Sequence, residues 1–436
     1  MPGSAIGRSL AAAIAAAVFV ALSSGVALAW ERSGEQITDI TLYRSYGERI
    51  AAGQVPYRDF RFEYPPGSLP ALVAPALPTS SWVPYRLVFG GLMALAGGAG
   101  ILIVARVRKR LGYPARETYG VLAALALAPV ALGALLLDRF DLLPALVTLL
   151  ALLAFVHDRH RLGACVLGLA IAVKLYPAVI LPLAVARTWR HVGRRDGLLV
   201  AACALGVASA VYIPFAVVAP DGVASSIGRQ LGRPLQIESL GAGVLLATHQ
   251  LTGLELDWSS GNGSQNLTGG QAVAVAALLS VVQIGALGWI WVRFARSPAS
   301  TERFVVAATA SVAAFVALGK VLSPQFLVWL LLLVPLATGR LLRWAGALYV
   351  LACGLTALWF PAHYWELVRE FDPFASWLVL SRDLVLVALV VVLAKVGTRR
   401  PPRSSFPDSA SATVAAEPRT FRARGGAGAR SPSHVP

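Results

Sequence analysis

Long apolar runs recur along almost the whole chain, separated by short clusters of charge, and this pattern constrains the fold more than any other feature. Of the 436 residues, 57% are hydrophobic and only 14% are charged. A helix that crosses a bilayer needs roughly 20 apolar residues, and tilted or broken helices in a large bundle can be shorter. The sequence therefore predicts an all-α polytopic membrane protein rather than soluble domains.

Twelve segments are apolar enough to be predicted as transmembrane helices. They cover residues 9–30, 83–105, 117–137, 141–156, 162–174, 176–189, 197–217, 271–292, 304–319, 325–339, 343–360 and 374–395. The short, Pro-rich stretch 67–78 is assigned to the outer surface, because a crossing there would move the basic cluster at 106–110 outside. Basic clusters belong on the cytoplasmic side.

Twelve crossings place both termini in the cytoplasm, together with most of the 38 Lys and Arg residues. Most of the 22 Asp and Glu residues then lie outside. Acidic residues contribute little to membrane orientation, so their excess outside is an independent observation. Chemistry that depends on carboxylates is therefore expected on the extracytoplasmic face.

The two ends of the chain differ from the bundle between them. Residues 9–30 end in a small-residue motif, so they form either a retained anchor, which their length favours, or a cleaved signal peptide. The segment 398–436 is rich in Arg, Ser, Pro, Ala and Gly and has no periodic apolar face. We predict a transmembrane domain at 1–397 followed by a disordered, basic cytoplasmic tail.

Several other classes of protein and site are disfavoured. The three cysteines lie in apolar runs with no CxxC pair and no His at metal-ligand spacing, so neither a disulfide framework nor a metal site is predicted. The net charge of +16 does not indicate nucleic-acid binding, because the basic residues punctuate apolar segments. No internal repeat is evident, which weakens the transporter architectures built from paired halves.

The first outer loop combines acids with aromatic residues. Apolar side chains recur at helical spacing over residues 37–51, which predicts an amphipathic surface helix with Asp39 near its start. Asp39 is then either a functional carboxylate or an ordinary capping or solvated Asp of an interfacial helix. The other substrate-binding candidates in this loop are Tyr43, Tyr57, Arg58, Asp59, Glu63 and Tyr64.

A charged cluster lies between two apolar runs, with almost no room for a solvent loop. It consists of Asp138, Arg139 and Asp141. Charges at that depth must be paired or functional. They belong either to a site or to a self-contained Asp–Arg–Asp cluster that pins two helices.

Two of the four lysines, Lys174 and Lys320, lie at outer corners where a following Pro prevents the helix from continuing. A compact ammonium there can bind a phosphate, although a Lys that snorkels from a helix end explains each position equally well. His363, also outside, is a further candidate ligand for phosphate or hydroxyl, with a structural role as the alternative.

The second long outer segment, 218–270, contains Gln236 and Glu238, which are candidates for binding sugar or acceptor hydroxyls. Together with the first outer loop, 31–82, this segment is expected to form the active-site face.

Taken in order, these motifs resemble glycosyltransferase family 87, whose members are polyprenyl-phosphate-dependent enzymes of the GT-C fold and include bacterial envelope mannosyltransferases. The resemblance spans most of residues 10–395. The motifs that carry it are Asp39-x-x-x-Tyr43, Gly53-x-x-Pro56-Tyr57-Arg58-Asp59-Phe60, Glu63-Tyr64-Pro65-Pro66, Arg139-Phe140-Asp141, Lys174-x-x-Pro177, Gln236-Ile237-Glu238-Ser239 and Ser323-Pro324-Gln325.

The resemblance implies a GT-C-like bundle of about twelve transmembrane helices with amphipathic helices on the outer face. It also implies an inverting transfer, in which a carboxylate base takes the acceptor's proton while the lipid phosphate leaves, with no metal or cofactor. Asp39 matches the catalytic acid of the family. The phosphate-binding candidates are Lys174, Lys320, Arg139 and His363. The substrate-binding candidates are Tyr43, Tyr57, Arg58, Asp59, Glu63, Tyr64, Asp138, Asp141, Gln236, Glu238, Gln325 and Arg382.

The implied substrates are a polyprenyl-phosphate sugar, with mannose expected first, and an envelope glycolipid or polysaccharide acceptor at the bacterial inner membrane. No nucleic-acid partner is implied. The rival function is a polytopic transporter or lipid flippase, whose essential polar groups would lie near the membrane midplane instead of the outer rim. A polymer ligase with a diphosphate-linked donor is a third interpretation.

Overall fold

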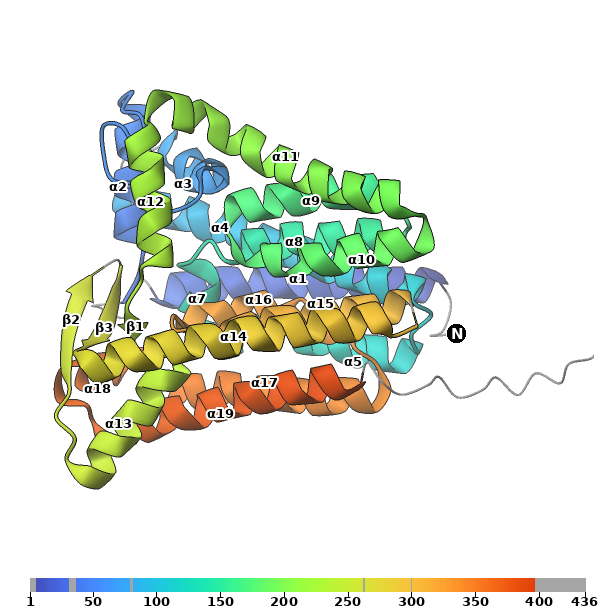
Figure 1. The fold of residues 1–436 in the computed structure, drawn as a ribbon. Coiled ribbons are helices and arrows are strands. Elements are labelled where there is room, and N and C mark those ends of the chain that lie inside the picture. The colour runs from blue at the N-terminus through green and yellow to red at the C-terminus, as the bar shows by residue number, and fades with distance from the viewer. Residues whose placement is uncertain (1–4, 31–36, 79–80, 262, 299, 397–436) are drawn as a thin grey trace, which may run out of the picture. The chain divides into compact units, whose positions relative to one another are not determined.

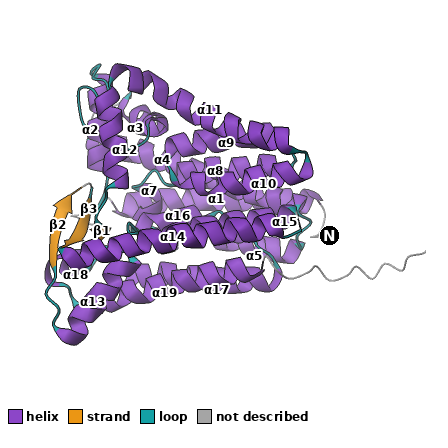
Figure 2. Ribbon diagram, in the orientation of Figure 1, coloured by secondary structure: helices purple, strands orange, loops and turns teal. Residues whose placement is uncertain are grey.

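The structure, a computed structural model, describes residues 5–30, 37–78, 81–261, 263–298 and 300–396. The predicted tail at 398–436 and the first residues of the outer loop, 31–36, lie outside this part of the chain. Within it, helices predominate and the strands are confined to one small sheet (Figure 2). The prediction of a helical, polytopic membrane protein is confirmed.

Six helices in the described part of the chain are long and apolar enough to cross a membrane. They are α1 (Ala5–Trp30), α4 (Trp82–Arg110), α11 (Arg194–Val218), α14 (Gly270–Arg296), α17 (Gly339–Trp359) and α19 (Pro373–Val396). Each of them overlaps one of the twelve predicted spans. The other predicted spans fold as shorter or interrupted helices, so within the described residues length and composition support six crossings.

Proline interrupts several of the remaining predicted spans. The shorter elements are α5 (Ala115–Ala126), α6 (Ala128–Leu132), α7 (Ala134–Leu137), α8 (Leu142–Val156), α9 (His160–Val173), η3 (Tyr176–Ile180), α10 (Leu181–His191), α15 (Thr301–Ala317), η4 (Pro324–Phe326), α16 (Leu327–Leu331) and η5 (Val334–Leu336). Pro129 lies in the first turn of α6, so the span predicted at 117–137 is broken into three helices. A Pro ring lacks the N–H donor and clashes with the preceding turn.

The helices run roughly side by side, so the bundle has two ends (Figure 1). α1 packs on α4 and α5, α8 packs on both α4 and α9, and α17 packs on α19. Small residues allow close approach of neighbouring helices. A Cβ atom on Gly168 of α9 would overlap the backbone carbonyl of Ala204 in α11, so these two helices meet backbone to backbone.

One end of the bundle carries a three-stranded antiparallel sheet, and we call it the sheet end (Figure 1). The strands are β1 (Leu235–Gln236), β2 (Asp257–Gly261) and β3 (Ser264–Thr268), in the order β1-β3-β2. The same end holds α2 (Ile40–Ala51), η1 (Pro66–Ser68), α3 (Leu69–Val73), η2 (Ala74–Ala76), α12 (Pro220–Leu231), α13 (Leu240–Thr252) and α18 (Tyr364–Glu370). The sequence pattern does not predict the sheet, because its strands are short and mostly polar.

The first outer loop forms the predicted surface helix. The helix was expected over residues 37–51 and is observed from Ile40 to Ala51 as α2. It buries Ile40, Tyr43 and Tyr46 on one face, as an amphipathic period requires. The Pro-rich stretch 67–78 forms short turns around α3 and is too short to cross a membrane.

The opposite end, which carries the α8–α9 and α14–α15 turns, is tied together by two buried arginines. Arg108 donates hydrogen bonds to the carbonyl oxygens of Pro335, at 2.5 Å, and Ala337, at 2.7 Å. Arg187 donates to the carbonyl oxygen of Phe155 at 3.0 Å and to Asp158 at 2.9 Å. Burying a guanidinium is costly unless it is hydrogen-bonded, and these bonds connect turns that lie far apart in the chain.

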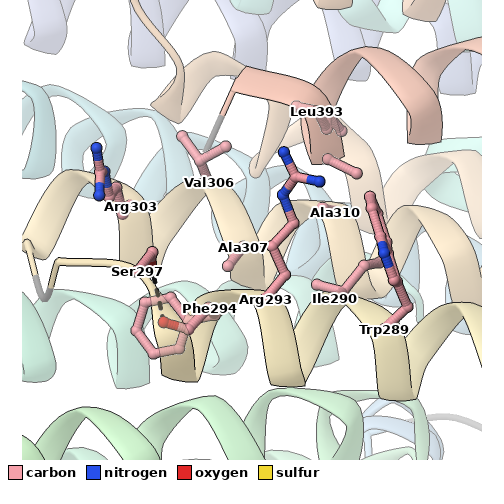
Figure 3. A pocket seen from close by; sticks show the side chains of 11 residues that line it. Trp289, Ile290, Arg293, Phe294, Ser297, Arg303, Val306, Ala307, Ala310 and Leu393 are labelled. Atoms are coloured by element: carbon pink, nitrogen blue, oxygen red, sulfur yellow. Dashed lines mark hydrogen bonds between the residues drawn. The ribbon is translucent and has the colours of Figure 1, made fainter. Parts of the chain in front are cut away.

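A small pocket at this opposite end lies between α14, α15 and α19 (Figure 3). Arg293 stands over the ring of Trp289 at 4.9 Å, and Leu393 closes the far side. The pocket has a volume of about 30 Å³. Such a space holds one or two water molecules and no larger ligand.

Candidate active site

Asp39 lies directly before the first turn of α2, and both of its carboxylate oxygens are engaged. One oxygen forms an ion pair with Arg139, and the other accepts a hydrogen bond from the Tyr43 hydroxyl at 3.2 Å. The Asp39 carboxylate makes no side-chain capping hydrogen bond to its helix, so of the structural alternatives the capping one is wrong. Its side chain is 29% exposed, whereas that of Arg139 is 7% exposed. Asp39 is thus a reachable carboxylate against a buried cation.

The charges at 138–141 bind three separate elements. Asp138 accepts two hydrogen bonds of 3.2 Å from Arg86 in α4, and Arg139 pairs with Asp39. Asp141 accepts from Lys174, at the end of α9, at 2.5 Å. The self-contained Asp–Arg–Asp interpretation is therefore wrong. The α7–α8 turn instead joins α4, α9 and the start of α2 through charge-assisted bonds, which are stronger than neutral ones.

Lys174 lies inside an aromatic enclosure beside Asp141. Its ammonium nitrogen is 4.6 Å from the ring centroid of Phe140, 5.2 Å from that of Trp329 and 5.7 Å from that of Phe326. Trp329 also donates its indole N–H to Asp141 at 2.5 Å. Aromatic faces attract cations electrostatically. The Lys174 side chain is only 16% exposed, so it is directed into the protein and does not snorkel outward.

The second outer segment brings Gln236 and Glu238 into a buried hydrogen-bond network. The Gln236 amide donates to the Glu238 carboxylate and to the Ser323 hydroxyl, the latter at 2.8 Å. Arg382 of α19 donates to the backbone carbonyl of Glu238 at 2.7 Å. The backbone N–H of Gln236 donates to the carbonyl of Lys320 at 3.0 Å. The 235–239 segment, the corner before η4 and α19 therefore meet at the sheet end.

Electrostatic interactions link this network to Arg139. Burial lowers the pKa of Arg139 to about 10, against the attraction of Asp141 and Glu238, so Arg139 stays charged at neutral pH. Burial also lowers the pKa of Arg233, which Tyr64, Glu63 and Glu238 oppose. Arg233 was not named among the predicted phosphate-binding residues, although it lies three residues before Gln236 in the same segment.

Burial raises the pKa of Glu238 to about 7, although Arg382 and Gln236 oppose the shift. The folded state therefore holds a proton that the unfolded chain releases near pH 4.5. We expect the free energy of unfolding to fall by roughly 3 kcal/mol as the pH rises from about 4.5 to about 7, and then to level off. Denaturant titrations in detergent across this pH range measure it.

The Glu238→Gln variant should lose that slope, because its side chain does not titrate. The matched control is Glu255→Gln, which changes an exposed carboxylate at the sheet end and should keep the slope. An unchanged slope in Glu238→Gln would show that another group carries the proton.

We call Asp39, Arg139, Asp141 and Lys174 the Asp39 cluster. Other predicted candidates form their contacts away from it. Asp59 pairs with Arg58 at 2.9 Å on the exposed surface. Lys320 donates to the carbonyl of Leu231 at 3.0 Å. His363, directly before α18, contacts Glu366 of that helix at 2.5 Å. The structure does not bring these residues to Asp39 or Lys174.

Aromatic residues of the first loop form the wall beside the cluster. The Tyr64 ring centroid lies 5.1 Å from that of Phe140 and 5.7 Å from that of Tyr43. Tyr57 donates its hydroxyl to the Tyr64 carbonyl at 2.5 Å. Glu63 has a half-buried side chain and accepts a hydrogen bond at its backbone carbonyl. Gln325 is also half-buried, and within the described part of the chain its side chain forms no hydrogen bond or ion pair with the other candidates.

Acids and cations from three motifs that lie far apart in the chain are thus paired. The motifs are Asp39, the 138–141 turn and Lys174. The model of glycosyltransferase family 87 matches residues 62–324, which is more than half of the chain. This chain belongs to glycosyltransferase family 87. No curated protein matches it in a sequence search.

The family assignment makes this chain a multi-pass membrane glycosyltransferase and confirms the resemblance read from the motifs. The residues matched to family 87 include the 138–141 turn, Lys174 and the 236–238 segment, but not Asp39. The geometry around Asp39 is therefore the separate evidence that joins the first outer loop to the family 87 region.

Proposed function

We propose that this family 87 enzyme transfers a hexose, with mannose as the first candidate, from a polyprenyl-phosphate donor to an envelope glycolipid or glycan. The reaction inverts the anomeric centre, and the sheet end faces away from the cytoplasm of the bacterial inner membrane. The observation that carries this proposal is the pairing of a partly exposed carboxylate, Asp39, with a buried guanidinium, Arg139. A base and an anion-binding cation are thereby adjacent.

In the proposed step, Asp39 accepts the proton of the acceptor hydroxyl as that oxygen attacks the anomeric carbon. The bond between this carbon and the phosphate oxygen breaks, and the bonding electrons leave with the phosphate. A single displacement inverts the centre. Arg139 and Lys174 stabilise the negative charge of the leaving phosphate, as preorganised cations do at developing charge.

Donor binding also prepares the base. Arg139 and Tyr43 occupy the two oxygens of Asp39, so an acceptor hydroxyl must compete for them. A donor phosphate that draws Arg139 away frees one oxygen to accept the proton. We therefore propose that the donor binds before the acceptor is deprotonated.

The role of Lys174 gives a prediction on donor affinity. The double variant Lys174→Gln/Asp141→Asn removes the cation without leaving the 1%-exposed Asp141 carboxylate unpaired. We expect the KM for the polyprenyl-phosphate donor to rise about tenfold to a hundredfold, the value of one charge-assisted hydrogen bond. Initial rates at varied donor concentration measure it. The matched control is Lys320→Gln at the same end, and a larger rise in that variant would contradict the assignment.

The overall proposal is tested with purified enzyme reconstituted in lipid. The enzyme receives polyprenyl-phosphate mannose with an envelope glycolipid extract, and in parallel other polyprenyl-phosphate sugars and a polyprenyl-diphosphate sugar. The anomeric configuration of the product, compared with that of the donor by NMR, reports inversion. Consumption of the diphosphate donor alone would favour a polymer ligase. If no donor is consumed, the transporter or flippase function becomes the better explanation.

A further inference from the structure

A basic cleft lies at the opposite end of the bundle, far from the Asp39 cluster. Its cations are Arg106, Lys109 and Arg110 from the last turns of α4 and Arg159 from the α8–α9 turn. The cleft has a volume of about 780 Å³. That volume lies in the range of sites that hold small-molecule ligands.

Within the described residues, no acidic side chain neutralises the cations of this basic cleft. No acidic side chain lines the cleft, and in the described part of the chain its four Lys and Arg side chains form no salt bridge. The nearest acid in sequence, Asp158, pairs with Arg187 instead. Arg108 on the same helix turns inward to backbone carbonyls, whereas Arg106, Lys109 and Arg110 stay exposed. Clustered charges of one sign around a hollow attract an ion of the opposite sign.

The remaining wall of the cleft is apolar. Leu150 of α8 is 37% exposed and Leu162 of α9 is 49% exposed, and both line the cleft. They belong to helices that the sequence places in the membrane, while the cations stand at the ends of these helices. Cations at helix ends lie at headgroup depth, and apolar side chains one or two turns deeper face the acyl chains.

We propose that the basic cleft binds an anionic phospholipid of the adjacent leaflet, which the charge pattern predicts to be cytoplasmic. The phosphate lies among Arg106, Lys109 and Arg159, and an acyl chain follows Leu150 and Leu162. Basic pockets between membrane helices suit such headgroups. A soluble anion would leave the apolar wall uncovered. The chain's own tail, 398–436, carries more Arg than acid and cannot supply the negative charge.

The test titrates the purified full-length protein with phosphatidylglycerol, and separately with phosphatidylcholine, and counts bound lipids by native mass spectrometry. The wild type should bind phosphatidylglycerol more tightly. The variant Arg106→Gln/Lys109→Gln/Arg159→Gln should weaken that binding on the order of a hundredfold, since each cation adds several-fold to the affinity for an anionic lipid. The matched control, Arg195→Gln/Arg340→Gln/Arg343→Gln, removes three exposed cations elsewhere at the same end and should bind like wild type.

A second variant separates lipid binding from misfolding and from simple anion binding. Leu162→Trp keeps every cation and fills the apolar wall, so it should also weaken phosphatidylglycerol binding while its unfolding temperature in phosphatidylcholine stays that of wild type. The proposal fails if the cation variant binds phosphatidylglycerol as tightly as its matched control. It also fails if glycerol 3-phosphate displaces the lipid at equal concentration, because the site would then recognise a free anion.

Discussion

The Asp39→Asn variant is expected to transfer sugar about 10²- to 10⁴-fold more slowly than wild type, the usual contribution of a general base. Asn has nearly the same size and still offers Tyr43 a hydrogen-bond acceptor, but it does not take up a proton at neutral pH. It also removes the anion that competes with the donor phosphate for Arg139, so donor binding should be retained or strengthened. Single-turnover transfer from a labelled donor, with donor binding measured in parallel, separates the two effects.

The control for this prediction is Asp257→Asn, which neutralises an exposed carboxylate on β2 at the same end. It should transfer at the rate of wild type. Undiminished transfer by Asp39→Asn would reject Asp39 as the base. Loss of donor binding together with transfer would instead show that Asp39 holds Arg139 in place, since that variant removes the ion pair between them.

Arg382→Met is expected to destabilise the protein by about 3–5 kcal/mol, because it leaves a buried carboxylate without its cation. Arg382 pairs with Asp383 at 2.6 Å, and both side chains are 0% exposed. Arg382 also donates to the carbonyl of Glu238, so its loss should loosen the 235–239 segment. Chemical unfolding in detergent measures the change in free energy.

The double variant Arg382→Met/Asp383→Leu is the matched control. It removes both charges, and replacing a complete buried ion pair by apolar residues is often close to neutral. Most of the lost stability should therefore return. If the double variant is as unstable as the single one, the hydrogen bond to Glu238 and the packing of Arg382, rather than the ion pair, carry the stability.

The helices that cross the membrane were largely predictable, whereas their interruptions were not. α1, α4, α11, α14, α17 and α19 each follow from an apolar run of sufficient length. The span at 117–137 reads as equally continuous, yet it divides at Pro129 and again at Gly133, where φ is +49°. A Pro can kink a membrane helix or end it, and the outcome depends on which neighbours satisfy the freed backbone groups.

The candidate site was predictable residue by residue but not as an arrangement. The charges at 138–141 had to be paired at that depth. Their sequence favoured pairing with one another, whereas the structure pairs Arg139 with Asp39 and Asp141 with Lys174. Asp383 gave no distinct signal, because an acid beside an Arg in the final helix has an ordinary explanation, and Arg233 was marked only by its place three residues before Gln236.

That the chain enters the membrane, which end is basic and which loops carry acids could all be read from the sequence, since apolar length and charge are local properties of a segment. Which acid meets which cation depends on how the segments pack. Lys174 and Lys320 look alike in sequence, each followed by a Pro at an outer corner. Packing against Phe140 and Trp329 turns Lys174 inward onto Asp141, whereas Lys320 donates to the carbonyl of Leu231 at the surface. That difference depends on contacts between residues far apart in the chain, and no local pattern encodes it.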